Sequence, residues 1–144
     1  MSIVRALYWA LVAATLLLYG VMVLWSLPQV AAAAGGQVAF DMRPGGYTFA
    51  EAMAFLAALS EEGQAFYLGT QHRLDSAYPA MLAMVLALGG YGLAGPDRRR
   101  WLARAIAAAA IIGAVADYLE NQAVVAMLEA GPAGLTADMV TAAS

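Results

Sequence analysis

The sequence has no cysteine and no lysine, and it contains few charged residues of any kind. Without a thiol, the chain can form neither a disulfide nor a thiolate that acts as nucleophile or metal ligand. Charged residues make up 12% of the 144 positions, about half the share of a water-soluble domain, whereas hydrophobic residues make up 63%. A formal net charge of -3 gives no reason to expect nucleic-acid binding. The composition therefore predicts an all-α integral membrane protein, a single helical bundle that binds no nucleic acid.

The first long uncharged run, residues 6–27, is long enough to cross a hydrocarbon core of about 30 Å as a helix. Tyr8 and Trp9 lie near one end and Trp25 near the other, where amphipathic aromatic side chains favour the headgroup level. A cleaved signal peptide is the alternative, because Arg5 precedes the run and small residues follow it. The run exceeds the apolar region of about 7 to 15 residues that such peptides have. We therefore predict a first transmembrane helix.

A short helix is predicted after a loop rich in Ala, Gly and Pro at residues 28–46. Thr48 and Glu51 have the spacing of a capping box, in which both side chains accept hydrogen bonds from amides at the start of a helix. The helix that follows, residues 49–59, is apolar over most of its surface but too short to span. We expect it to lie in the membrane interface or to cap the bundle. Ser60, followed by two glutamates, predicts the start of another helix.

A second span is predicted over residues 74–94, with a polar section before it and Pro79 inside it. If the helix continues through Pro79, the missing amide leaves the carbonyl of Asp75, four residues earlier, without its usual partner. Asp75 then offers two acceptors, its carbonyl and its carboxylate. In the plainer alternative, Asp75 caps a helix that begins there.

The third span is predicted over residues 101–128, after a tight basic loop at residues 95–100. Within this span, Ala109 and Gly113 have the four-residue spacing that lets another helix approach closely. Basic residues in short loops tend to stay in the cytoplasm. We therefore place the N-terminus and the basic loop inside, and residues 28–72 outside. Five of the seven basic residues carry this prediction: Arg5, Arg98, Arg99, Arg100 and Arg104.

Polar residues gather in two helical sections that can lie at one depth. Asp117, Glu120 and Asn121 have the i, i+3, i+4 spacing that places side chains on one helix face. Charged groups that face hydrocarbon cost several kcal/mol, so these residues should face protein, a water-filled cavity or a partner. At 1.5 Å per residue from the inner ends of the spans, Asp117 to Asn121 lies roughly 18 to 24 Å along its helix and Asp75 roughly 27 Å. The predicted site is one outer-leaflet polar cluster: His72, Arg73, Asp75, Tyr78, Asp117, Glu120 and Asn121.

Two short motifs carry a resemblance to a known group. Leu74 to Pro79 has the pattern L-D-x-x-[YF]-P, and Asp117 to Asn121 has the pattern D-x-x-E-N. Over roughly positions 40 to 128 the chain resembles uncharacterised small bacterial membrane proteins that carry both motifs on consecutive spans. The resemblance implies a helical bundle in the bacterial inner (plasma) membrane and a site at the paired motifs, but no activity. That group usually has four spans, so this sequence, which ends at Ser144, either is truncated or leaves one side of the bundle open.

Two interpretations of the cluster involve no chemistry. In the first, Arg73 pairs with a carboxylate of the cluster and Asn121 bridges backbone or carboxylate, which holds the helices in register. In the second, the cleft accepts a lipid headgroup, a small amphiphile or a partner helix. The partner helix would belong to another protein or to a second copy of the chain. The two interpretations share every residue and differ in whether a cavity exists. We predict a membrane protein that scaffolds or binds a partner or lipid through the cluster.

A membrane-embedded enzyme is the alternative. His72, Asp75, Asp117 and Glu120 could ligate a divalent metal that activates water against a lipid-like substrate. Without metal, Glu120 or Asp117 would act as general acid or base, as in an isomerase, and Asp75 is the third catalytic candidate. The chain has one His and no HExxH spacing, so no motif identifies a cofactor. A proton pathway is a further possibility, but the inner halves of the spans have no ionisable group to continue it.

Overall fold

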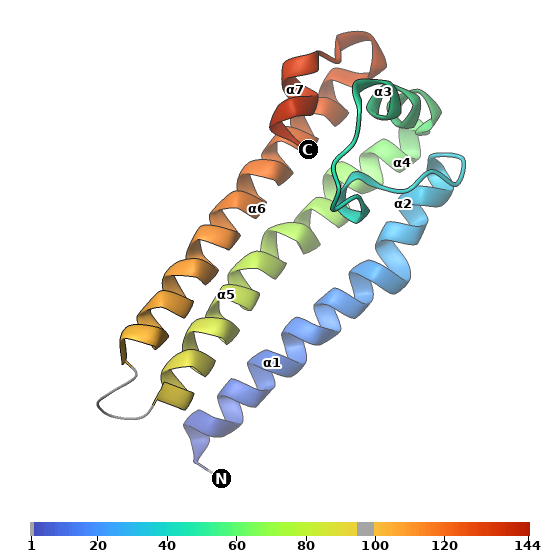
Figure 1. The fold of residues 1–144 in the computed structure, drawn as a ribbon. Coiled ribbons are helices and arrows are strands. Elements are labelled where there is room, and N and C mark those ends of the chain that lie inside the picture. Colours follow the sequence, from blue (N-terminus) through green and yellow to red (C-terminus); the bar gives the residue numbers. More distant parts are fainter. Residues whose placement is uncertain (1, 95–99) are drawn as a thin grey trace. The chain divides into compact units, whose positions relative to one another are not determined.

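The computed structural model describes residues 2–94 and 100–144, and every regular element in these residues is helical (Figure 1). Three helical segments are long and apolar enough to cross a membrane: Ile3–Ala33, Glu61–Leu93 and Arg100–Gly134. The predicted all-helical membrane fold with three spans is confirmed. Residues 95–99, which form most of the predicted basic loop, lie outside the described residues.

The first long segment continues beyond residue 27, where the sequence predicted its end. Helix α1 (Ile3–Val21) passes through a π-helical turn, η1 (Met22–Ser26), into α2 (Leu27–Ala33). Pro28 does not end the helix because it lies in the first turn of α2, where a missing backbone amide costs little.

The second long segment begins thirteen residues before the predicted position 74. Ser60 caps α4 (Glu61–Phe66) by accepting a hydrogen bond from the amide of Gly63 at 3.1 Å, so the predicted helix start is confirmed. A second π-helical turn, η3 (Tyr67–Gln71), then connects α4 to α5 (His72–Ala94). The polar section and the apolar section therefore belong to one continuous helix.

The third long segment, α6 (Arg100–Gly134), extends past the predicted end at residue 128 and bends at Gly131. Gly131 has a φ of 63°, which glycine adopts without the steric cost that other residues have. The remaining elements are short: the 3-10 turn η2 (Phe40–Met42), α3 (Phe49–Ala58) and α7 (Ala137–Ala142).

Helix α3 is the short apolar helix that the sequence predicted, and its capping box is present. The amide of Glu51 donates to the Thr48 hydroxyl at 3.3 Å, and the Glu51 carboxylate accepts from the Thr48 amide at 2.7 Å. The hydrogen bonds from the Thr48 amide and hydroxyl hold the pKa of Glu51 below its ordinary value.

The chain forms two compact units, each built from distant parts of the sequence. Unit 1 comprises Met1–Tyr19 and Ser76–Tyr118, as far as these ranges are described, and unit 2 comprises Gly20–Asp75 and Leu119–Ser144. Within unit 1, the segments of α1, α5 and α6 run side by side (Figure 1). Glycines on α5 allow this close packing, because a Cβ atom at Gly89 would lie 2.7 Å from the hydroxyl of Tyr8.

The two units differ in how they bury apolar side chains. Unit 1 exposes most of its large apolar residues, for example Leu17, Leu93 and Ile112 at 70%, 87% and 69%. Such a surface suits contact with lipid and would be unfavourable in water. Unit 2 instead has a packed core that includes the polar side chains of Ser26, Gln71 and Asp75. Its largest fully buried residues are Val30, Phe40, Phe55, Tyr67, Met127 and Leu128, with the polar Ser26 and Gln71.

Candidate functional site

Three of the seven predicted site residues line one small cavity in unit 2. His72, Asp75 and Asn121 share this cavity with Asp41, Tyr67 and apolar residues of α6. Its volume is about 10 Å³, which is the space that a single water molecule needs. Together with two hydrogen-bonded neighbours, these residues form what we call the buried polar cluster: Ser26, Asp41, Tyr67, Gln71, His72, Asp75 and Asn121.

Gln71 is at the centre of the hydrogen bonds in this cluster. Its Nε2 atom donates to Oδ2 of Asp75 at 2.8 Å and is 3.5 Å from Oδ2 of Asp41. Its Oε1 atom accepts from the Ser26 hydroxyl at 2.5 Å. The Tyr67 hydroxyl donates to the same Asp41 oxygen at 2.9 Å. One buried amide therefore joins two carboxylates and links four parts of unit 2, namely η1, η2, η3 and the start of α5.

Pro79 leaves the carbonyl oxygen of Asp75 without a backbone donor, and a side chain of α6 donates a hydrogen bond to it instead. Helix α5 passes through Pro79, so the alternative in which Asp75 begins a helix is wrong. The carbonyl of Asp75, which has no amide from Pro79, accepts a hydrogen bond from Nδ2 of Asn121 at 3.4 Å within unit 2. Within unit 1, the next carbonyl, that of Ser76, accepts from the hydroxyl of Tyr118 at 2.7 Å. The predicted extra acceptor at Asp75 thus has its partner in the D-x-x-E-N motif.

Two of the helical segments that contribute to the cluster contain a π-helical turn at this point. Turn η1 ends at Ser26, turn η3 begins at Tyr67 and ends at Gln71, and the two turns pack against each other. Isolated π-helical turns within α-helices occur frequently at functional sites, because they redirect side chains at a local energetic cost. Here the two turns direct the Ser26 hydroxyl and the side-chain amide of Gln71 toward each other.

The other four predicted residues lie outside the buried polar cluster. Arg73 and Glu120 are exposed side chains of unit 2, whereas Tyr78 and Asp117 belong to unit 1. The carboxylate of Glu120 lies close enough to Tyr47 to change the pKa of its phenol. Burial raises the pKa of the Tyr47 phenol, and the negative charge of Glu120 raises it further.

The predicted metal ligands do not form a common group in the part of the chain that the structure describes. Among residues 2–94 and 100–144, no three His, Asp or Glu side chains lie together in a way that could hold a metal ion. Of the four candidates, His72, Asp75 and Glu120 belong to unit 2 and Asp117 belongs to unit 1. A metal-dependent reaction stays a prediction that this geometry does not favour.

Four members of the buried polar cluster were not among the predicted site residues. Tyr67 and Gln71 precede Asp75 by eight and four residues, and this spacing on one helix could have indicated a shared face. Ser26 and Asp41 come from distant segments, so no spacing in the sequence connects them to Gln71.

A second candidate site is a groove along α5 and α6 in unit 1, which we call the Asp117 groove. Its volume is about 450 Å³, within the range of ligand sites. Asp117 is exposed and is the charged residue of the lining. Among the described residues, no cation or hydrogen-bond donor pairs with its carboxylate. The other lining residues are apolar, and those of α6 are small except for Ile106: Pro79, Leu82, Ala83, Leu86, Ile106, Ala109, Ala110, Gly113 and Ala114.

Comparison of the chain with protein-family models, with curated proteins and with solved structures finds no match. The resemblance to the four-span bacterial group therefore stays an expectation.

Proposed function

We propose that the chain is a small membrane scaffold protein that binds a transmembrane helix of another protein in the Asp117 groove. The observation that carries this proposal is an exposed carboxylate on an apolar, lipid-facing unit. A carboxylate in contact with hydrocarbon is costly, and residues of this kind normally pair with a partner. Asp117 is therefore the polar contact, and the groove beside it is the surface that the partner helix covers.

The chemistry of the groove specifies the kind of partner. Ala109, Ala110 and Gly113 keep the α6 wall thin, which allows the backbone of a second helix to approach closely. The partner helix should itself have small residues at the contact. It should also carry a hydrogen-bond donor, such as Arg, Lys, Asn or Gln, at the level of Asp117. In the group that the chain resembles, a fourth span would supply such a helix within one chain.

The buried polar cluster supports a scaffold rather than a headgroup-binding site or an enzyme. Gln71 uses its amide on Ser26, Asp41 and Asp75, and the remaining cavity has room for about one water molecule. A lipid headgroup or an amphiphilic substrate does not fit in this volume. We infer that the cluster holds unit 2 in one conformation and that binding takes place elsewhere.

The distribution of arginines gives the orientation in this proposal. With Arg5, Arg100 and Arg104 on the cytoplasmic side of a bacterial inner membrane, Asp117 would lie about 20 Å along α6 from Arg104, in the outer half of a hydrocarbon core of about 30 Å. The partner helix would then place its donor in the outer leaflet.

Photo-crosslinking in cells of the organism that makes the chain tests the proposal. Benzoylphenylalanine replaces Ala110, which lines the groove, and in a control it replaces Ala108, which is exposed on α6 but does not line the groove. We expect one discrete protein adduct from position 110 and none from position 108. The adduct should persist in Asp117→Glu and disappear in Asp117→Leu. Mass spectrometry of the crosslinked peptide should identify a membrane span with a hydrogen-bond donor.

Three results would overturn the proposal. An adduct that is unchanged in Asp117→Leu would show that the carboxylate has no part in binding. Crosslinks to lipid alone would show that the groove has no protein occupant. A crosslink to a second copy of the chain would show that the groove is a contact within a homo-oligomer and does not bind a helix of another protein.

A further inference from the structure

Unit 1 contains another groove, between the first turns of α1 and the last turns of α5. Its volume is about 830 Å³, at the upper end of the range for ligand sites. It shares no lining residue with the Asp117 groove. We call it the Arg5 groove, and its lining comprises Ser2, Val4, Arg5, Leu7, Tyr8, Trp9, Leu11, Leu88, Gly89, Tyr91, Gly92 and Leu93.

Two glycines on α5 create the hollow of this groove. Gly89 and Gly92 are three residues apart, so they lie on one face of the helix. The hydroxyl of Tyr8 fills the notch at Gly89, whereas a Cβ atom at Gly92 would meet nothing within 4 Å. The adjacent walls are apolar and exposed, with Leu88 at 53% and Leu93 at 87%. The groove can therefore accept an unbranched apolar chain along α5.

The groove is amphipathic, because polar groups lie among the first residues of α1. Arg5 is exposed, and among the described residues no carboxylate pairs with its guanidinium. The hydroxyl of Ser2 accepts a hydrogen bond from the backbone amide of Arg5 at 3.4 Å, so it adds a second polar side chain at this end of the groove. Tyr8 and Trp9, whose rings are in edge contact at 5.4 Å, are residue types that favour the headgroup level.

We infer that the Arg5 groove binds one anionic glycerophospholipid, with the phosphate on the Arg5 guanidinium and an acyl chain along Gly92 and the apolar wall. A guanidinium matches a phosphate with two parallel hydrogen bonds. The end of a span is the level at which a lipid phosphate lies. The cytoplasmic leaflet, on which we expect this end of α1, is the leaflet rich in anionic lipids.

Charge and shape favour a lipid over other occupants. A soluble anion would use Arg5 but would leave the apolar length of the groove without a partner. A transmembrane helix would cover the apolar length but would need an anionic residue at the membrane surface to pair with Arg5. A lipid supplies both the phosphate and the apolar chain in one molecule.

Native mass spectrometry of the full chain with defined lipids tests the inference. The probes are phosphatidylglycerol and phosphatidylcholine with identical acyl chains. The wild type should bind one phosphatidylglycerol at least tenfold more tightly than phosphatidylcholine. Arg5→Gln should remove this preference while retaining residual binding of both lipids, and Arg5→Lys should keep part of the preference. Gly92→Leu should weaken the binding of both lipids, because the leucine side chain fills the groove without a clash.

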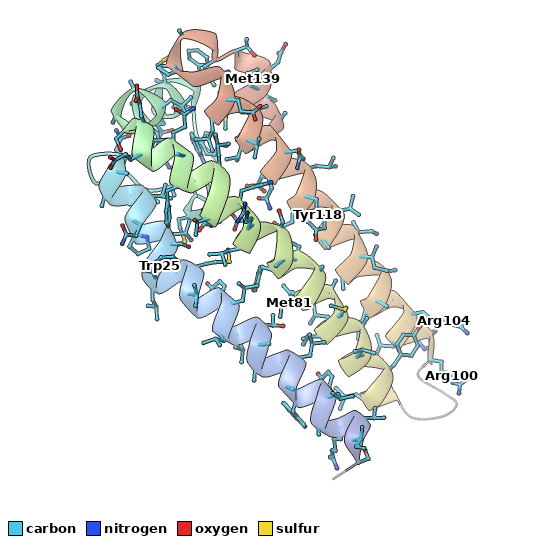
Figure 2. All side chains as sticks on the ribbon, turned by 180° about the vertical axis from the view of Figure 1, so that it is seen from behind. Trp25, Met81, Arg100, Arg104, Tyr118 and Met139 are labelled. Atoms are coloured by element: carbon cyan, nitrogen blue, oxygen red, sulfur yellow. The ribbon has the colours of Figure 1, made fainter. Side chains whose placement is uncertain are left out.

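Matched controls distinguish lipid binding in the Arg5 groove from non-specific electrostatic attraction of anionic lipid to the protein. Arg104→Gln removes an exposed arginine near the start of α6, next to Arg100, that does not line the groove (Figure 2). Gly20→Leu places the same side chain at a position on α1 where a Cβ meets nothing within 4 Å. Both should bind lipid as the wild type does. Inorganic phosphate should not displace the lipid, because it lacks the acyl chain.

The inference fails if Arg104→Gln weakens phosphatidylglycerol as much as Arg5→Gln does, since the attraction would then be diffuse. It also fails if Gly92→Leu leaves binding unchanged, or if inorganic phosphate competes fully. Thermal unfolding of each variant in detergent checks that the protein remains folded, so that a loss of lipid binding can be assigned to the groove.

Discussion

The hydroxyl of Ser26 donates a hydrogen bond of 2.5 Å to Oε1 of Gln71, and both side chains are completely buried. Each residue ends a π-helical turn, so this bond connects η1 to η3 within unit 2. A buried amide oxygen that loses its donor keeps the full cost of its desolvation. The stability of unit 2 should therefore depend on this pair more than on its exposed hydrogen bonds.

We predict that Ser26→Ala lowers the free energy of unfolding by about 1 to 3 kcal/mol, because the Gln71 oxygen is left unsatisfied. The double variant Ser26→Ala, Gln71→Leu should cost less than the sum of the single variants, because they share one interaction. Denaturant unfolding in detergent measures all three. Thr141→Ala, which removes an exposed hydroxyl, is the control and should change stability by less than about 0.5 kcal/mol. Strict additivity of the two changes would contradict the prediction.

A second prediction concerns the acceptor that Pro79 releases. Asn121→Ala should lower the free energy of unfolding by about 0.5 to 1.5 kcal/mol, because the Asp75 carbonyl loses its donor. In a Pro79→Ala background the restored amide can bond that carbonyl, so Asn121→Ala should cost less. Tyr118→Phe is the matched control, because its acceptor, the Ser76 carbonyl, does not depend on Pro79. Equal costs of Asn121→Ala in both backgrounds would refute this explanation.

A third prediction tests the contact between α2 and α4. A Cβ atom at Gly63 would lie 2.4 Å from Cβ of Ala33, and neither atom can move without the backbone. Gly63→Ala should therefore destabilise the protein by about 1 to 3 kcal/mol. Gly69→Ala, at a position where a Cβ meets nothing within 4 Å, should leave the melting temperature unchanged or raise it slightly. A similar effect of both substitutions would show that α2 and α4 are not in close contact.

A fourth prediction concerns pH. The folded state holds the pKa of Glu51 below its unfolded value. The capping carboxylate therefore stabilises the protein above the unfolded pKa of about 4.3, and this contribution is lost as the pH falls through the folded pKa. Glu51→Gln keeps a capping acceptor without a charge. Its melting temperature should fall less than that of the wild type as the pH is lowered from about 6 to about 3. Identical pH profiles of the two proteins would exclude a role for the carboxylate.

The sequence by itself determined the helices, because the free-energy terms that produce them are local. A run without charges must satisfy its own backbone hydrogen bonds in hydrocarbon, which gives the three spans. The caps at Thr48 and Ser60 depend on residues three positions away, and the released acceptor at Asp75 depends on Pro79 four positions away. Each of these features could be predicted from a short stretch of sequence. The span ends could not, because polar turns such as η3 continue a helix once its side chains find partners.

Only the tertiary structure decided which polar residues meet. Arg73 and Asp75 are two positions apart in one helix and therefore lie on different faces, but only packing decides that Asp75 is buried in the cluster and Arg73 is exposed. Asp117, three positions from Glu120, belongs to a different unit and lines a groove of its own. Ser26 and Asp41 reach Gln71 because two π-helical turns and the η2 segment bring together residues up to 45 positions apart. The burial of these side chains depends on packing between distant segments, so it cannot be predicted from the spacing of residues within one helix.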